Sequence, residues 1–189
     1  MSYTEIYKFG KDGNAELFAE VKNSFRGAMA VWNILEKKYL PKYIPEWAMG
    51  DTSREYSRSS DFFGKALKEV WDLFYSDKIS ENDKVVLGST FDNVIVMRND
   101  IPMLIESFRC FEGETSLKEQ SNIIERIYND NKTFIAIAWN QTSVNGDAWE
   151  SDEIMLDEED EEFYLPYNIL KENKHWNLFE SIYNQINNS

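Results

Sequence analysis

The first forty residues carry two different patterns of hydrophobic positions. Residues 3–9 and 15–21 contain the short apolar runs that are typical of strands, and the Asp12-Gly13 pair between them favours a tight reversal. Over residues 24–40 the apolar positions recur every three or four residues, and Pro41 follows them. The chain therefore begins with a predicted hairpin, which is followed by a helix that Ser24 caps and Pro41 ends.

Similar patterns predict the elements in the rest of the chain. Further helices are expected over residues 61–75, 100–111, 117–129 and 174–187, and residues 80–87 fit either a short helix or, in part, a strand. Two internal strands are expected at 93–97 and 133–139. The second of these, Thr-Phe-Ile-Ala-Ile-Ala-Trp, is apolar on both faces, which predicts a central place in a sheet. Asn145-Gly146 predicts another turn, at which the chain folds back as a hairpin.

These elements together indicate an α+β fold. We expect residues 1–189 to form a single compact domain with an N-terminal hairpin, a small mixed sheet that includes 93–97 and 133–139, and about five helices. An apolar fraction of 42% and an aromatic fraction of 15% are enough for a packed interior rather than a disordered chain.

Several kinds of chemistry lack the residues that they need. A single cysteine, Cys110, excludes an internal disulfide or a multi-thiolate metal site, and a single histidine, His175, excludes a two-histidine zinc site. Cys110 is expected to be a buried, inert thiol. Phosphate-binding glycine loops and nucleophile elbows are absent from the sequence, so we expect no cofactor and no metal. Neither a secretory signal nor a membrane span is predicted, which favours a cytoplasmic protein.

The charge of the chain is concentrated in one stretch. The whole chain carries a net charge of −14, but only −4 of it lies outside residues 147–162, which contain no lysine or arginine. We expect this acidic stretch to form a loop or a hairpin. Its ten carboxylates are Asp147, Glu150, Asp152, Glu153, Asp157, Glu158, Glu159, Asp160, Glu161 and Glu162. Such a local field attracts basic partners and repels nucleic acid and anionic membranes, so direct binding to either is not expected.

Large aromatic residues flank the acidic stretch. Trp149, Phe163 and Tyr164 are candidate anchors for a partner, because interfaces combine a polar surround with a few large apolar side chains. The first hypothesis is a non-enzymatic interaction protein that docks a basic macromolecule through residues 147–164, in one version as a mimic of nucleic acid. Its composition resembles small acidic accessory proteins of bacteria or phages, such as immunity proteins and host-defence inhibitors. A solvated loop that only keeps the protein soluble is the plainer interpretation.

A second hypothesis concerns the loop after strand 133–139. Asn140, Thr142 and Asn145 follow a predicted central strand, and the ends of strands often hold ligands. These residues are the candidates for a small-ligand site, either in a binding protein or in a hydrolase that depends on carboxylates or a metal. A hydrogen-bonded turn with no ligand is the alternative.

Overall fold

A computed structural model describes residues 3–22, 27–40, 68–130, 132–141, 149–156 and 162–187. The main sheet has the strand order β2-β1-β4-β3-β7 and is mixed, because β3 and β7 run parallel while the other neighbours run antiparallel. Its strands are β1 (Tyr3–Phe9), β2 (Ala15–Lys22), β3 (Val94–Met97), β4 (Ala136–Gln141) and β7 (Trp176–Asn177). The predicted α+β class with a small mixed sheet is confirmed.

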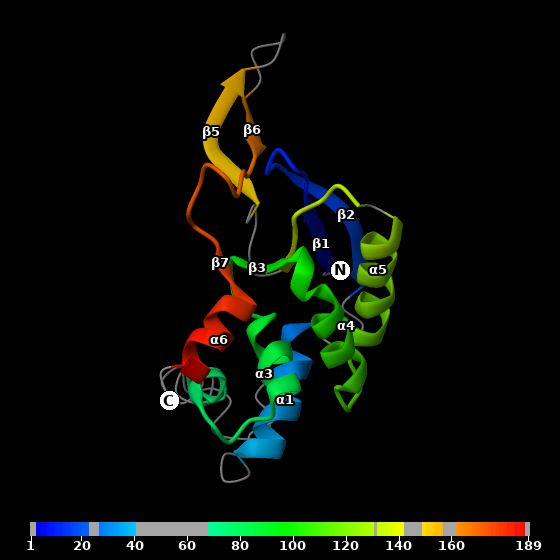
Figure 1. Ribbon diagram of the computed structural model, residues 1–189, viewed down its shortest axis with the longest axis vertical. Coiled ribbons are helices and arrows are strands. Elements are labelled where there is room, and N and C mark those ends of the chain that lie inside the picture. Colours follow the sequence, from blue (N-terminus) through cyan, green and yellow to red (C-terminus); the bar gives the residue numbers. More distant parts are fainter. Residues whose placement is uncertain are drawn as a thin grey trace, which may run out of the picture.

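Helices cover one side of this sheet and extend beyond its end (Figure 1). They are α1 (Ala28–Tyr39), α3 (Glu81–Gly88), α4 (Ile101–Cys110), α5 (Leu117–Asp130) and α6 (Leu178–Asn187), with the 3-10 turns η2 (Leu73–Tyr75) and η3 (Arg98–Asp100). A second, two-stranded sheet consists of β5 (Glu150–Leu156) and β6 (Glu162–Pro166). It lies at the end of the molecule opposite most of the helices (Figure 1).

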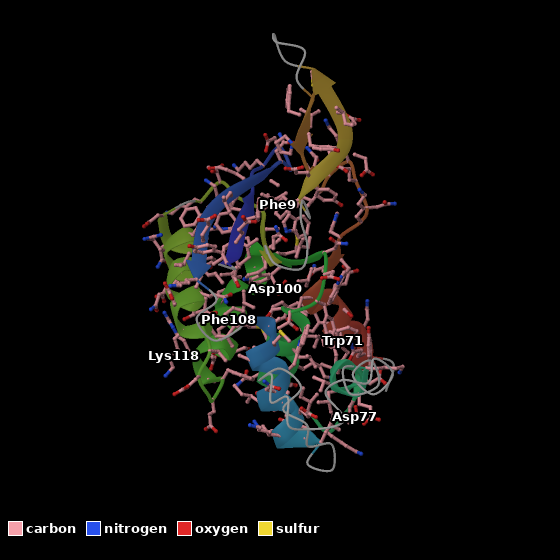
Figure 2. All side chains as sticks on the ribbon, turned by 180° about the vertical axis from the view of Figure 1, so that it is seen from behind. Phe9, Trp71, Asp77, Asp100, Phe108 and Lys118 are labelled. Carbon is pink, nitrogen blue, oxygen red and sulfur yellow. The ribbon has the colours of Figure 1, made fainter. Side chains whose placement is uncertain are left out.

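The central position of β4 follows from its sequence, as predicted. Ile137 and Trp139 face the main hydrophobic core, which they share with the helices, while Ala136 and Ala138 face a second, smaller core on the other side of the sheet. Successive side chains of a strand point to opposite faces, so a strand that is apolar at every position must be covered on both. The alanines share this second core with the ring of Phe9, which is labelled in Figure 2.

The predicted N-terminal hairpin is also confirmed. β1 and β2 pair through a turn in which Gly13 has φ +85°, a conformation that favours glycine. A Cβ atom on Gly13 would lie 2.7 Å from Oδ1 of Asn168, so the turn also needs glycine for close approach to a distant segment. The same turn thus reverses the chain and contacts Asn168, which lies near the C-terminal end of the chain.

The starts of α3 and α6 can be compared with the helices predicted from the sequence. The segment after residue 80 is helical rather than a strand: α3 spans Glu81–Gly88, and the hydroxyl of Ser80 caps it by accepting a hydrogen bond from the backbone N–H of Asp83 (3.2 Å). The final helix begins at Leu178 rather than at residue 174, since Trp176 and Asn177 pair with β3 as a short strand. The start predicted at residue 174 is therefore wrong. The side chain of Asn177 accepts from the N–H of Phe179 (3.2 Å) at the true start.

Some predicted features fall outside the described residues, namely the cap at residue 24, Pro41, the first part of helix 61–75 (residues 61–67) and the turn at Asn145-Gly146. The end of that helix is described, with residues 68–72 helical. The prediction of a hairpin after β4 is wrong in one respect. β4 pairs with β1 and β3, whereas the next described strand, β5, pairs with β6.

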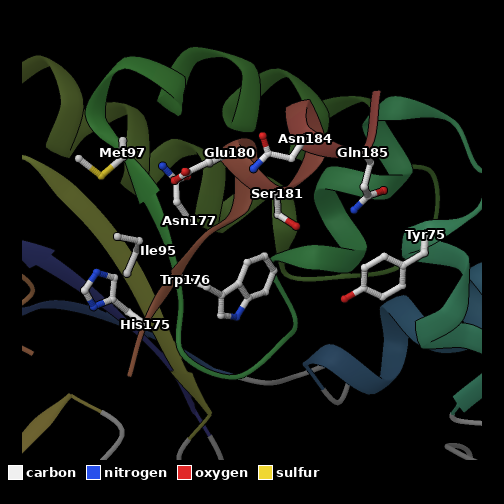
Figure 3. Close-up of a pocket in the computed structure, with 10 residues that line it drawn as sticks. All are labelled: Tyr75, Ile95, Met97, His175, Trp176, Asn177, Glu180, Ser181, Asn184 and Gln185. Carbon is white, nitrogen blue, oxygen red and sulfur yellow. The ribbon is translucent and has the colours of Figure 1, made fainter. Parts of the chain in front are cut away.

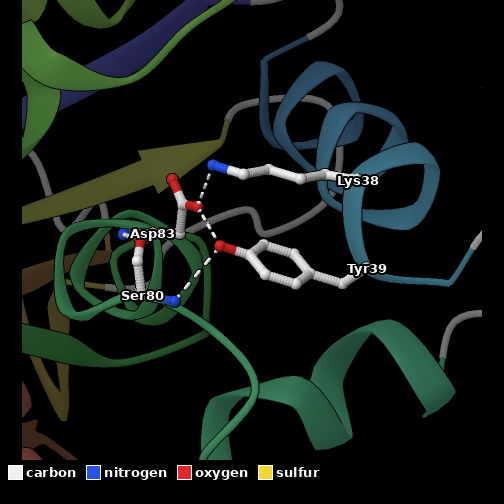
Figure 4. A network of polar contacts seen from close by, with 4 residues as sticks. All are labelled: Lys38, Tyr39, Ser80 and Asp83. Atoms are coloured by element: carbon white, nitrogen blue, oxygen red, sulfur yellow. Dashed lines mark hydrogen bonds and ion pairs between the residues drawn. The ribbon is translucent and has the colours of Figure 1, made fainter.

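A buried carboxylate joins α1 to α3. Asp83 accepts from Lys38 Nζ (2.7 Å) and from the hydroxyl of Tyr39 (2.5 Å), and that hydroxyl accepts from the N–H of Ser80 (3.1 Å; Figure 4). The hydrogen bond to Asp83 raises the pKa of Lys38. Burial of Asp83 is tolerated because its charge is paired and hydrogen-bonded.

Across the described part of the chain, no helix is long and apolar enough to cross a membrane.

Candidate functional site

The hairpin β5–β6 presents large apolar side chains on both of its faces. Ile154 lies opposite Tyr164, and Met155 lies opposite Phe163. Because neighbouring residues of a strand point to opposite faces, each pair occupies its own face of the ribbon. The exposed fractions are 49% for Ile154, 48% for Met155, 42% for Phe163 and 52% for Tyr164. The hairpin extends away from the main sheet, so both faces are accessible (Figure 1).

Carboxylates surround these apolar residues. Glu150, Asp152 and Glu153 are exposed on β5. Asp152 forms an ion pair with Lys174 (2.6 Å), and this contact raises the pKa of the lysine. Such an exposed pair contributes little to stability in water. The described part of the acidic stretch is therefore an ordered strand in which the acidic residues precede the apolar ones, and one of its carboxylates is paired with a lysine outside the hairpin.

Trp149 is not exposed, and its assignment as a partner anchor is corrected here. Its side chain is only 3% accessible, and its ring packs edge-to-face against Phe9 (5.3 Å) and Tyr167 (5.4 Å). The indole N–H donates to the backbone carbonyl of Trp139 (2.8 Å). The small side chains of β4 leave room for this ring, so Trp149 fills the second core and fixes the start of the hairpin.

The other end of the hairpin is attached to the turn between β1 and β2. Asn168 is buried, and its Nδ2 donates to the carbonyl of Asp12 (3.0 Å) and to Oδ1 of Asn14 (2.8 Å). Backbone bonds reinforce the attachment, from the N–H of Ala15 to the carbonyl of Tyr167 (2.8 Å) and from the N–H of Ile169 to the carbonyl of Gly13 (3.0 Å). The hairpin is thus held at both ends of its base. No local pattern indicated this role of Asn168, because the acceptors of its Nδ2 lie more than 150 positions away.

The remaining predicted site residues are either structural or outside the described residues. Asp147, Thr142, Asn145 and residues 157–161 belong to the second group. Asn140 is buried, and its Nδ2 donates to Glu5 Oε2 (2.9 Å), so it links β4 to β1. The described structure therefore gives Asn140 a role in holding the sheet together, and a ligand site at Thr142 and Asn145 stays a prediction.

A pocket that the sequence did not indicate lies between β3, β7 and α6. Its volume is about 980 Å³, and its residues are Tyr75, Ile95, Met97, His175, Trp176, Asn177, Glu180, Ser181, Asn184 and Gln185. His175 and Ile95 lie at one end, Tyr75 lies at the other, and Trp176 is between them (Figure 3). Among the described residues that line the pocket, the single carboxylate, Glu180, and the histidine are not hydrogen-bonded to each other.

The histidine in this pocket has a defined hydrogen bond. The hydroxyl of Tyr167 accepts from the N–H of Lys174 (2.9 Å) and shares a hydrogen bond with Nδ1 of His175 (2.9 Å). Burial lowers the pKa of His175, although Glu172 acts in the opposite direction. Burial therefore disfavours the protonated imidazole, and the ring is oriented by a tyrosine, which is a structural partner rather than a nucleophile.

Cys110 does not form a pair with this histidine. It is exposed at the end of α4, contrary to the expected buried thiol, and it lines a different hollow with Arg109 and Glu125. Within the described ranges, no group of three or more His, Cys, Asp or Glu side chains could hold a metal ion.

No protein-family model, curated protein or solved structure matches this chain, so the hairpin and the pockets are the features that indicate its function.

Proposed function

We propose that this chain is a non-enzymatic interaction protein that docks a basic protein surface through the hairpin β5–β6 and the acidic stretch. The observation that carries the proposal is the group of four half-exposed large apolar side chains, Ile154, Met155, Phe163 and Tyr164, on an ordered hairpin whose polar residues are mainly acidic. Exposed apolar groups with a polar surround mark interaction surfaces. A hairpin that only improved solubility would have no need of them.

The two kinds of side chain contribute differently to docking. Full burial of a large apolar side chain is worth about 1.5–3 kcal/mol, so covering the exposed half of four such residues gives roughly 3–6 kcal/mol before the costs of association. The carboxylates repel one another at short range, and a basic partner relieves that repulsion while its association is accelerated. Affinity is thus assigned mainly to the apolar pairs, and selection of a basic partner to the charges.

The attachment of the hairpin supports the same proposal. A contact surface loses less conformational entropy on binding when it is already ordered. Trp149 and Asn168 hold the two ends of the hairpin base, so β5 and β6 are positioned before any partner arrives. Both residues therefore support the hairpin without touching the partner.

Affinity capture from a lysate of the source cells at low salt tests the proposal with two matched variants. The hairpin variant replaces Ile154 and Tyr164 by serine. The control variant replaces Leu17 and Tyr183, which are exposed to a similar extent at 45% and 43%, by serine elsewhere on the surface. The proposal expects wild type and the control to retain the same protein of basic isoelectric point, and the hairpin variant to lose it.

The charges are tested separately by converting residues 157–162 to their amides. Capture should then weaken, and the steep fall in capture between low and moderate salt should become shallow, because fewer screened charges remain. Equal capture by the hairpin variant and the control variant, or retention of only acidic proteins, would contradict the proposed function.

A further inference from the structure

A second hollow, on the helical part of the molecule, is lined mainly by aromatic rings. Its volume is about 430 Å³, and its residues are Trp32, Trp71, Asp72, Tyr75, Thr90, Phe91 and Asp92. They come from α1, from the segment that ends in η2, and from the turn that follows α3. The volume lies in the range of small-molecule sites, and this hollow is separate from the hairpin. An inference from it therefore does not depend on the proposed docking function.

The rings stand as walls rather than as a stack. Trp71, labelled in Figure 2, makes an angle of 76° with Trp32 at 5.7 Å and an angle of 79° with Phe91 at 6.5 Å. The indole N–H of Trp32 donates to Oγ1 of Thr90 (2.8 Å), which fixes the orientation of that ring. Phe91 also packs against Phe74 (5.4 Å) in the core. The walls are therefore held in place without a ligand, while Trp71 and Tyr75 stay exposed at the opening.

The charges around the rings favour a cation. The faces of aromatic rings are electron-rich, and Asp72 and Asp92 add two carboxylates, whereas the described residues that line the hollow include no lysine or arginine. Asp72 pairs with Lys68 (2.6 Å), but both side chains are largely exposed, so this pair costs little to rearrange. A phosphate or carboxylate ligand would find only repulsion here.

The hydroxyl of Thr90 in the wall is already occupied. Oγ1 of Thr90 accepts from Trp32 and donates to the carbonyl of Leu87 (2.6 Å). Against the rings of Trp32, Trp71 and Phe91, the N–H groups of a plain ammonium ion would meet no oxygen acceptor, and only those turned toward Asp72 and Asp92 would be paired. A methylated ammonium ion has apolar methyl groups that match the rings and a charge that they attract.

We propose that the box of Trp32, Trp71, Tyr75 and Phe91 binds a small organic cation through a methylated ammonium group. The rings surround the methyl groups, and Asp72 and Asp92 stabilise the positive charge at the rim. Recognition is by charge and shape together, so a neutral molecule of the same shape binds less well.

Titration of the full chain with choline, and with the uncharged isostere 3,3-dimethylbutan-1-ol, tests this proposal. Calorimetry should give an affinity for choline that is about tenfold higher than for the isostere. The N-methyl proton resonance of choline should also move upfield, because it enters the shielding region of the rings. Equal affinities for the two compounds, or no binding of choline at millimolar concentration, would overturn the proposal.

Substitutions locate the site. Trp71→Leu should weaken choline binding about tenfold, while Trp71→Phe, which keeps an aromatic wall, should retain part of it. Tyr164→Leu removes an exposed ring on the distant hairpin and should leave binding unchanged. Near-ultraviolet circular dichroism checks that each variant is folded. Wild-type affinity in Trp71→Leu, or an equal loss in Tyr164→Leu, would exclude the aromatic box as the site.

Discussion

Replacement of Trp149 by alanine tests whether this residue supports the hairpin from within the core. The change removes a ring that packs between Phe9 and Tyr167 and deletes the hydrogen bond to the carbonyl of Trp139. Truncation of a buried tryptophan costs about 3–5 kcal/mol, and the unpaired carbonyl adds roughly 1 kcal/mol. The free energy of unfolding should therefore fall by about 4–6 kcal/mol, a large part of the stability of an ordinary domain.

Urea unfolding gives the measurement. With a slope of about 2 kcal/mol per molar urea, the midpoint of Trp149→Ala should fall by roughly 2–3 M. Trp149→Phe keeps most of the packing and should lose only about 1–2 kcal/mol. Phe163→Ala, on the exposed part of the hairpin, should change the stability by less than about 0.5 kcal/mol. If the midpoint of Trp149→Ala matched that of Phe163→Ala, Trp149 would belong to the surface and not to the second core.

Three other changes probe the supports of the fold and its dependence on pH. Asp83→Asn removes the charge shared by Lys38 and Tyr39 and should reduce the free energy of unfolding by about 1.5–3 kcal/mol in urea; an unchanged midpoint would show that the network is not stabilising. Gly13→Ala forces a side chain into a positive φ and against Asn168, so a thermal scan should show a loss of about 1–3 kcal/mol, and a gain in melting temperature would contradict this. Burial lowers the pKa of His175, so the stability that its neutral form provides is present above about pH 6.5 and is lost as pH falls through the lower, folded-state value. His175→Gln should therefore flatten the fall in stability between about pH 7 and 5, and an equally steep fall in the variant would assign it to other groups.

Elements with strong local patterns could be predicted from the sequence. The central position of β4 followed from a run that is apolar at every position, and the first hairpin followed from its strands and Asp12-Gly13. The start of α6 could not be predicted in this way. Trp176 fits the helical period, but its segment pairs with β3, which is remote in sequence.

The construction of the candidate site could not be predicted from the sequence. Trp149 lies among carboxylates, so local composition suggested exposure, whereas Ala136 and Ala138 leave the space that its ring occupies. The exposure of Ile154 and Met155 could not be predicted from the sequence, because it depends on a hairpin that extends away from the main sheet. The support from Asn168 and the aromatic box depend on contacts between distant segments, which no local pattern encodes.

Site-specific photocrosslinking tests the docking surface most directly. A benzophenone amino acid is placed at Tyr164 on the hairpin or, as a control, at Tyr183 on α6, which is similarly exposed. After irradiation in a low-salt lysate of the source cells, the probe at residue 164 should yield one discrete adduct with a basic protein, and the probe at residue 183 should not. Identical adducts from both positions, or none from residue 164, would contradict the account.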